Sequence, residues 1–104
     1  MSRPAILAIR ARRELAEALK RVADANPDAA ERLYSAVQDA ARRIGANPAL
    51  GARRPRLAST RYRIWPIPRF RYILAYTDRT IPPRIVRMVH TSRDLPRVLA
   101  DLLD

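Results

Sequence analysis

The spacing of apolar residues divides the 104-residue chain into segments with different predicted structures. Residues 1–10 contain an unbroken apolar run, Ala5–Ile9, which predicts a short strand buried on both faces. The period then becomes helical, with Leu15, Leu19 and Val22 at i, i+4 and i+7. A strand followed at once by an amphipathic helix is therefore expected at the start of the chain.

A second helix is predicted directly after the first. Asn26 can cap the exposed amides of its first turn, Pro27 suits the first helical position, and Asp28 complements the positive end of the helix dipole. Apolar residues then recur every three or four positions as far as Ile44, and Gly45 is expected to end the helix in a left-handed conformation. The two helices should form a hairpin whose apolar stripes pack on the rest of the chain.

Alternating apolar and polar residues predict a run of strands after a loop at residues 46–59. Pro66 and Pro68 cannot donate ladder hydrogen bonds, so the strand that contains Pro66 is expected either to lie at a sheet edge or to end in a bulge near them. In the last strand, Ile85 and Arg87 are expected to share one face. A short final helix is predicted, with Asp94 as its N-cap. The predicted strands span Arg61–Ile67, Phe70–Thr77 and Arg84–His90.

The element order is strand, helix, helix, three strands and helix, which predicts an α+β fold. The chain length fits one domain covering residues 1–104.

Composition excludes several classes of function. The absence of Cys excludes a disulfide framework, a thiolate metal site and a cysteine nucleophile, and a single His with well-spaced carboxylates offers no three-ligand metal cluster. The two glycines do not form a phosphate-binding loop, so no cofactor is expected. No apolar run is long enough to span a bilayer, and we expect a cytoplasmic protein without a membrane partner.

Positive charge is concentrated in the middle of the chain. The sequence has 21 Lys and Arg against 10 Asp and Glu, which gives a net charge of +11. Residues 40–77 carry nine Arg and no carboxylate, whereas the segments on either side are each close to neutral. Such a localised field can steer an anionic partner toward the protein.

Aromatic residues interleave with these arginines, a composition suited to stacking on bases and contacting phosphates. Packing of the rings in the core and solvation of an Arg-rich loop are the structural alternatives. The candidate residues for binding a macromolecule are Arg53, Arg54, Arg56, Arg61, Arg63, Trp65 and Arg71.

His90 is the one side chain whose ordinary pKa lies near neutrality, which makes it the candidate for proton transfer. The alternative is a hydrogen-bonded His at the end of a strand. Arg93 and Asp94 likewise have a structural interpretation, as a local ion pair and a helix cap.

Several segments, taken in their order and spacing, carry a family resemblance. They are the opening strand followed by Ala11–Leu15, the helical hairpin, the loop from Asn47 to Leu57, the strand Arg69–Tyr76 and the closing Val89–Leu95. Over nearly the whole chain they resemble the RelE/ParE superfamily, the toxin half of type II toxin–antitoxin pairs. The resemblance implies a helical hairpin packed on a small twisted antiparallel sheet with a short C-terminal helix. It also implies a cognate antitoxin whose acidic or amphipathic segment wraps the toxin in a hetero-oligomer.

The superfamily has two branches with different implied activities. RelE-like members are metal-free, ribosome-dependent mRNA endonucleases, and the matching residues here would be Arg61, Arg63, His90 and Arg93. Arg is a poor general base, no Lys occurs in residues 21–104, and no Tyr or Glu follows Tyr76, so the C-terminal tyrosine of the ribonuclease branch is missing. This departure favours the ParE branch, whose implied action is growth inhibition through DNA gyrase and plasmid stabilisation. A non-enzymatic nucleic-acid-binding module is a third hypothesis, carried by the central arginines. The residues listed for macromolecule binding could serve either a target or the antitoxin.

Overall fold

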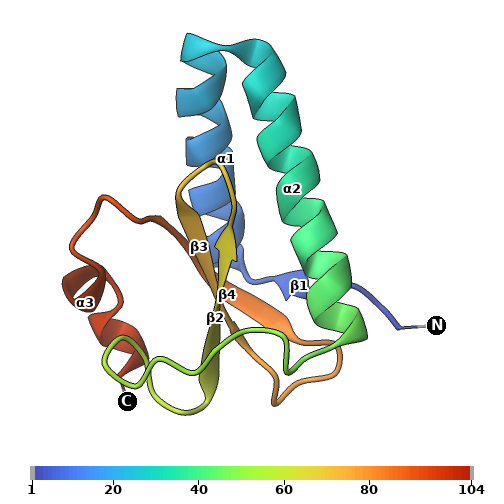
Figure 1. Cartoon of the computed structure of the whole chain (residues 1–104), viewed down its shortest axis with the longest axis vertical. Coiled ribbons are helices and arrows are strands. Elements are labelled where there is room, and N and C mark those ends of the chain that lie inside the picture. The colour runs from blue at the N-terminus through green and yellow to red at the C-terminus, as the bar shows by residue number, and fades with distance from the viewer. Residues whose placement is uncertain (1, 104) are drawn as a thin grey trace.

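The computed structural model describes residues 2–103 and confirms an α+β fold (Figure 1). Two long helices, α1 and α2, lie side by side against the sheet, and the short helix α3 lies away from them, on the far side of the strands (Figure 1). The elements are β1 (Ile6–Leu7), α1 (Ile9–Ala25), α2 (Pro27–Ala46), β2 (Tyr62–Ile67), β3 (Tyr72–Thr77), β4 (Arg84–His90), α3 (Leu95–Val98) and the 3₁₀ helix η1 (Ala100–Leu102). None of the described helices is long and apolar enough to cross a membrane.

The sheet has the strand order β1-β4-β3-β2, which makes it mixed rather than wholly antiparallel. The three later strands pair antiparallel, as expected, and β1 adds to β4 in parallel. This arrangement follows from connectivity, because the whole helical hairpin and two strands separate β1 from β4. Pro66 lies in β2 at the opposite edge, where a missing amide donor leaves no neighbour unsatisfied, which confirms the predicted edge position.

The first strand is shorter and more exposed than its apolar run predicts. Only Ile6–Leu7 pairs with β4, and α1 already begins at Ile9; Met1 lies outside the described residues. Ile6 is 47% exposed and Ile9 is 67% exposed, so the prediction of a strand buried on both faces was wrong. The Ala8 amide still donates to Ile85 of β4, while the Ala8 carbonyl accepts from the first turn of α1.

Helix α2 begins as predicted and ends differently. The Asn26 side chain accepts hydrogen bonds from the amides of Asp28 and Ala29 at 3.0 and 3.2 Å, with Pro27 in the first turn. Gly45 does not end the helix in a left-handed conformation, because α2 continues to Ala46 and no glycine has positive φ. A Cβ at Gly45 would collide with the backbone carbonyl of Arg3, so glycine is required there for close approach of the N-terminal segment.

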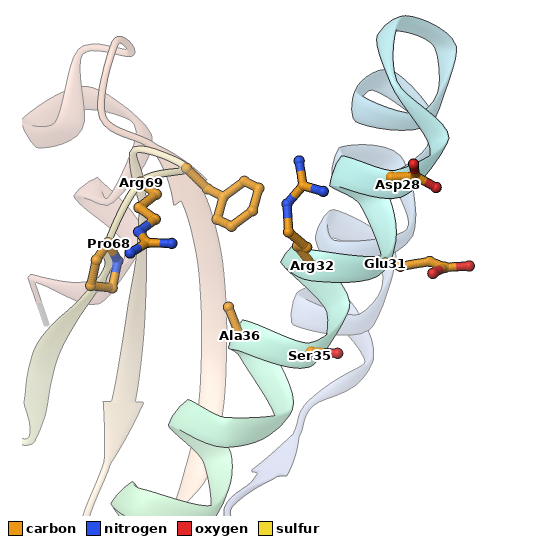
Figure 2. Close-up of a pocket in the computed structure, with 8 residues that line it drawn as sticks. Asp28, Glu31, Arg32, Ser35, Ala36, Pro68 and Arg69 are labelled. Carbon is orange, nitrogen blue, oxygen red and sulfur yellow. The ribbon is translucent and has the colours of Figure 1, made fainter.

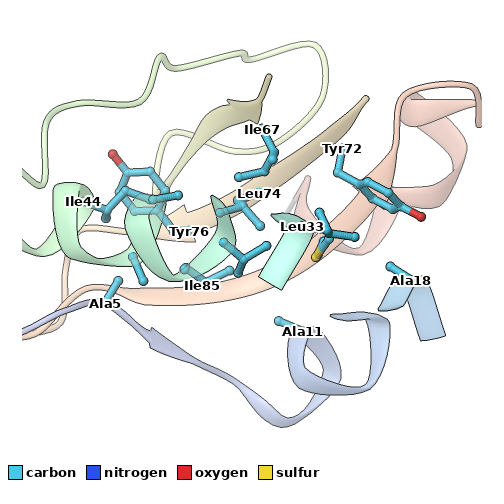
Figure 3. Close-up of a cluster of buried hydrophobic side chains, with 14 residues drawn as sticks. Ala5, Ala11, Ala18, Leu33, Ile44, Ile67, Tyr72, Leu74, Tyr76 and Ile85 are labelled. Carbon is cyan, nitrogen blue, oxygen red and sulfur yellow. The ribbon is translucent and has the colours of Figure 1, made fainter. Parts of the chain in front are cut away.

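Two hydrophobic clusters cover the two faces of the sheet. The main cluster lies between the α1–α2 hairpin and the sheet and contains Leu33, Ile44, Leu74 and Tyr76 (Figure 3). The second cluster lies on the other face, where Leu57 from the loop and the C-terminal helices cover the strands. Alternate residues of β3 contribute to each cluster, as the period of two predicts. The members that the C-terminal segment supplies to the second cluster are Leu95, Val98, Leu99 and Leu102.

A bulge in β4 overturns the predicted alternation of that strand. Tyr76 of β3 pairs with Ile85, but Ala75, the residue before Tyr76, pairs with Arg87. Val86 is therefore an extra residue in β4. Ile85 therefore lies in the main cluster, whereas Arg87 projects from the other face of the sheet. The expectation that these two share a face was wrong.

Arg87 is buried, with 4% of its side chain exposed, and it joins three parts of the chain. Its guanidinium donates to the Glu14 carboxylate of α1 at 3.1–3.2 Å, to the Val98 carbonyl at 2.7 Å and to Asp101 at 3.0 Å. Glu14 also accepts from the Met88 amide at 2.9 Å. This amide lies beyond the point where β1 leaves β4, so the carboxylate takes the place of a neighbouring strand. Asp94 precedes α3 as predicted, although its side chain makes no capping hydrogen bond.

Removing the Glu14 charge should destabilise the fold. Glu14→Gln leaves the buried Arg87 with a weaker partner, and we expect a loss of about 2–4 kcal/mol of unfolding free energy, measured by urea denaturation. Glu17→Gln on the exposed surface of the same helix is the matched control, with an expected change below about 0.5 kcal/mol. Equal urea midpoints for the two variants would contradict a structural role for the Glu14–Arg87 contact.

Candidate interaction surfaces

The Arg-rich loop between α2 and β2 is anchored on the buried hydroxyl of Tyr76. This hydroxyl accepts a hydrogen bond from the Gly51 amide and donates one to the Pro48 carbonyl, both at 2.7 Å. A Cβ at Gly51 would lie 2.8 Å from the Tyr76 ring, so only glycine permits the contact. Burial raises the pKa of the Tyr76 phenol above its ordinary value, which keeps the donating proton in place. The ring is therefore a structural anchor.

Two of the predicted binding arginines hold this loop in place. Arg63 donates to the Asp78 carboxylate at 2.8 Å and to the Gly51 carbonyl at 2.8 Å, and its side chain is only 19% exposed. Arg53 donates to the Thr60 carbonyl and lies 3.5 Å from Asp78. The hydrogen bond from Arg63 holds the pKa of the Asp78 carboxyl below its ordinary value.

The aromatic candidates belong largely to the core. Trp65 is partly buried against the main cluster, and the Arg43 guanidinium lies 5.3 Å from the centre of its ring. Tyr72 is buried, and its hydroxyl accepts from Arg21 of α1 at 3.2 Å, a contact that raises the pKa of Arg21. These contacts agree with core packing of the rings.

Apart from Arg42 and Arg43 on α2, the remaining central arginines fall into two groups at opposite ends of the β2–β3 hairpin. Arg54, Arg56 and Arg61 lie at the end that carries the loop, whereas Arg69 and Arg71 lie at the turn between the strands. All five are exposed, and none forms an ion pair with a carboxylate of residues 2–103. The strands between them span about 17 Å, so the positive segment of the sequence makes two separate surfaces.

The four candidate ribonuclease residues do not converge. Arg63 pairs with Tyr76 at one end of the sheet, whereas His90 pairs with Tyr72, about 14 Å further along β3. His90 stacks edge-on against the Tyr72 ring, and its Nδ1 lies 2.7 Å from the Ser92 hydroxyl. That geometry is a hydrogen-bonded His at a strand end. Arg61 lies beside Arg63, and Arg93 lies beyond His90 in a cleft that also contains Arg13 and Arg97.

An apolar groove beside β1 is a surface that the sequence did not indicate. It has a volume of about 440 Å³ and lies between β1 and the two long helices. Ile6 and Tyr34 line it and are 47% and 46% exposed. Arg12 and Arg42 are its charged residues, and no carboxylate lines it. The signal in the sequence was the run Ala5–Ile9, which we interpreted as a strand with two buried faces.

The outer edge of β1 presents the backbone groups of Leu7, of which the carbonyl already accepts a hydrogen bond from a side chain. The Ile6 amide donates to the Pro83 carbonyl just before β4, and the Ala8 amide donates to Ile85 of β4, so the polar backbone groups of Leu7 point the other way. The Leu7 carbonyl accepts from the Arg12 guanidinium at 3.1 Å. No group of three His, Cys, Asp or Glu that could hold a metal ion occurs within residues 2–103. The chemistry available at the groove is therefore binding, through apolar contact, positive charge and a strand edge.

The Arg63–Asp78 contact should make stability depend on pH in the acid range. A carboxyl whose pKa is lower in the folded state contributes stability above its unfolded pKa, near 3.8, and loses it as the pH falls through the folded pKa. We expect Asp78→Asn to cost about 1–2 kcal/mol at neutral pH and to remove part of the loss seen below about pH 4. Urea denaturation across this range measures both effects.

Asp39→Asn is the control, because Asp39 pairs with Arg42 at 3.6 Å between two exposed side chains. Its expected cost is below about 0.5 kcal/mol. An Asp78→Asn variant with the pH dependence of the unsubstituted protein would rule out the contact as its source.

Comparison with known proteins places the fold and its surfaces in a functional context. The family described as the ParE toxin of the type II toxin–antitoxin system parDE matches residues 6–95. A search of curated proteins gives no match. The matched region extends from β1 to the start of α3 and so includes the helical hairpin and the whole sheet. The chain belongs to the ParE toxin family of type II toxin–antitoxin systems.

Proposed function

We propose that this ParE-family toxin is held by an antitoxin segment in the groove beside β1 and that the unbound toxin inhibits DNA gyrase without catalysing a reaction. The antitoxin part of the proposal is carried by the groove itself. A groove in which half-exposed apolar side chains lie together is typical of a surface that a partner covers. The family supports the existence of such a partner, because type II toxins are paired with antitoxins.

Three properties of the groove select the chemistry of the antitoxin segment. Its apolar wall suits the apolar face of an amphipathic segment, and Arg12 and Arg42 suit acidic side chains on that segment. The edge of β1 can accept an added strand. An acidic residue that draws Arg12 away from the Leu7 carbonyl would free that carbonyl for a backbone hydrogen bond. Charge attraction and strand addition then occur at the same place.

The gyrase part of the proposal rests on the family match and is supported by the layout of the candidate ribonuclease residues. Arg63 is bonded to Asp78, and His90 lies at the other end of the sheet. A general base and a phosphate clamp must lie within a few ångströms of one reacting phosphate to act together. Their separation favours a toxin that acts by binding.

Weakening the apolar wall should weaken antitoxin binding. Ile6→Thr keeps a β-branched residue in the strand but removes apolar surface, and we expect about tenfold weaker binding of the protein encoded immediately upstream, measured by calorimetry. Leu103→Thr is the control, because Leu103 is exposed to the same degree, 46%, and lies outside the groove. A larger loss for Leu103→Thr than for Ile6→Thr would contradict the assigned groove.

The purified toxin should inhibit supercoiling by gyrase, and His90→Gln should leave that inhibition unchanged. The reason is that binding needs no proton transfer. A supercoiling assay measures inhibition, and a coupled translation reaction measures mRNA cleavage. Unchanged supercoiling at micromolar toxin would overturn the gyrase proposal. Translation-dependent cleavage that His90→Gln abolishes would establish the ribonuclease alternative instead.

A further inference from the structure

A second cleft lies between α2 and the turn that joins β2 to β3, away from the groove beside β1. It is open to solvent and has a volume of about 710 Å³. Arg32 and Ala36 line it from α2, and Pro68, Arg69 and Phe70 line it from the turn. Figure 2 shows Arg32 on the side of α2 that faces the turn, and the Arg69 side chain beside Pro68 on the turn.

The two guanidiniums in this cleft have no internal acidic partner. Neither Arg32 nor Arg69 forms an ion pair with a carboxylate of residues 2–103. Asp28 and Glu31 lie at the rim, and their carboxylates point away from the turn (Figure 2). The interior is therefore positive and the rim negative.

The turn holds Arg69 in an unfavourable backbone conformation. Arg69 has φ 76° and Arg71 has φ 57°, in the left-handed region that Gly and Asn adopt most readily. The Arg71 carbonyl accepts from the Thr91 amide at 2.7 Å, which ties the turn to the end of β4. Strained non-glycine residues often lie where a side chain has a role in binding. At position 69, the strained residue is one whose side chain lines the cleft.

We propose that this cleft binds an acidic side chain of a partner protein, with a neighbouring apolar side chain packed on Ala36, Pro68 and Phe70. Two guanidinium groups suit one carboxylate, and the partly buried Phe70 offers an apolar surface beside them. Both rim carboxylates, Asp28 and Glu31, come from α2, so a basic residue on the α2 side of the acidic one would meet them. The preferred segment is thus one with an acidic residue, an apolar residue beside it and a basic residue toward α2.

The charges of the cleft argue against a nucleic acid as its occupant. The lining residues carry two positive and two negative charges. A chain of phosphates would be attracted by the two arginines and repelled by the two carboxylates at the rim. Within residues 2–103, the loop end of the sheet, with Arg54, Arg56 and Arg61, has no such rim of unpaired carboxylates. The cleft proposal does not depend on the gyrase or antitoxin proposals, because it concerns a different surface.

A short blocked peptide of sequence Lys-Leu-Glu-Leu-Lys tests the cleft directly. We expect it to shift the amide resonances of residues 32–36 and of Arg69 and Phe70 in NMR titrations. The same peptide with Gln in place of Glu should bind at least about tenfold more weakly, because a charge-assisted contact is lost. Arg32→Gln should reduce binding of the Glu peptide to the same degree.

Two matched variants of the turn separate the side chain from the backbone. Arg69→Asn and Arg71→Asn each place a residue that tolerates positive φ, so both should keep or raise the urea midpoint of the protein. Only Arg69→Asn should lose binding of the Glu peptide, because Arg71 does not line the cleft.

Three results would overturn the proposal. One is equal binding of the Glu and Gln peptides. Another is an equal loss of binding in Arg69→Asn and Arg71→Asn, which would indicate general attraction to positive charge. The third is tighter binding of single-stranded oligothymidylate than of the Glu peptide at the same resonances, which would identify a nucleic-acid site.

Discussion

The contact between Glu14 and the bulged strand β4 fixes the arrangement on which the surfaces depend. Because β1 pairs with only the first part of β4, the strand would otherwise present an open edge. Glu14 closes that edge by accepting from the Met88 amide, and the same carboxylate neutralises the buried Arg87. Arg87 in turn reaches Asp101 and holds the C-terminal segment over the second hydrophobic cluster. One side chain of α1 thus joins the helical hairpin, the sheet and the C-terminus, and leaves β1 as the edge beside the helical hairpin that can accept a partner strand.

The charge of the molecule has a different distribution from the charge of the sequence. The nine central arginines form one block in the chain, but Arg53 and Arg63 are bonded to Asp78 and the loop backbone, and Arg43 lies over Trp65. Arg42 lies on α2 and lines the groove beside β1, and the other five separate to the two ends of the β2–β3 hairpin. The groove beside β1 takes its charge partly from Arg12, which lies outside the central block. Net charge therefore identified the sign of a partner but not the surface that receives it.

Periodic segments were predictable and local exceptions were not. Helix α2 and strand β3 could be predicted from the spacing of their apolar residues. The helix packs one regular face on the main cluster, and the strand packs both of its faces. The bulge at Val86 was not predicted. It places the buried Arg87 against Glu14, a partner far away in the sequence, and local spacing does not reveal such a contact. The prediction for Gly45 was wrong because glycine is required there by the close approach of the Arg3 backbone and not by a left-handed turn. The groove was not predicted for a similar reason, since an apolar run does not reveal whether the rest of the chain covers it or leaves it exposed.

Hydrogen–deuterium exchange of the Leu7 amide, with and without the bound antitoxin, tests the central claim most directly. This amide points away from β4 on the edge of β1, where the account places the antitoxin strand. The account predicts that antitoxin binding slows its exchange strongly, while the amides of the Arg54–Arg61 loop change little. Unchanged exchange at Leu7 with strong protection of that loop would contradict it and would move the antitoxin to the arginine-rich end of the sheet.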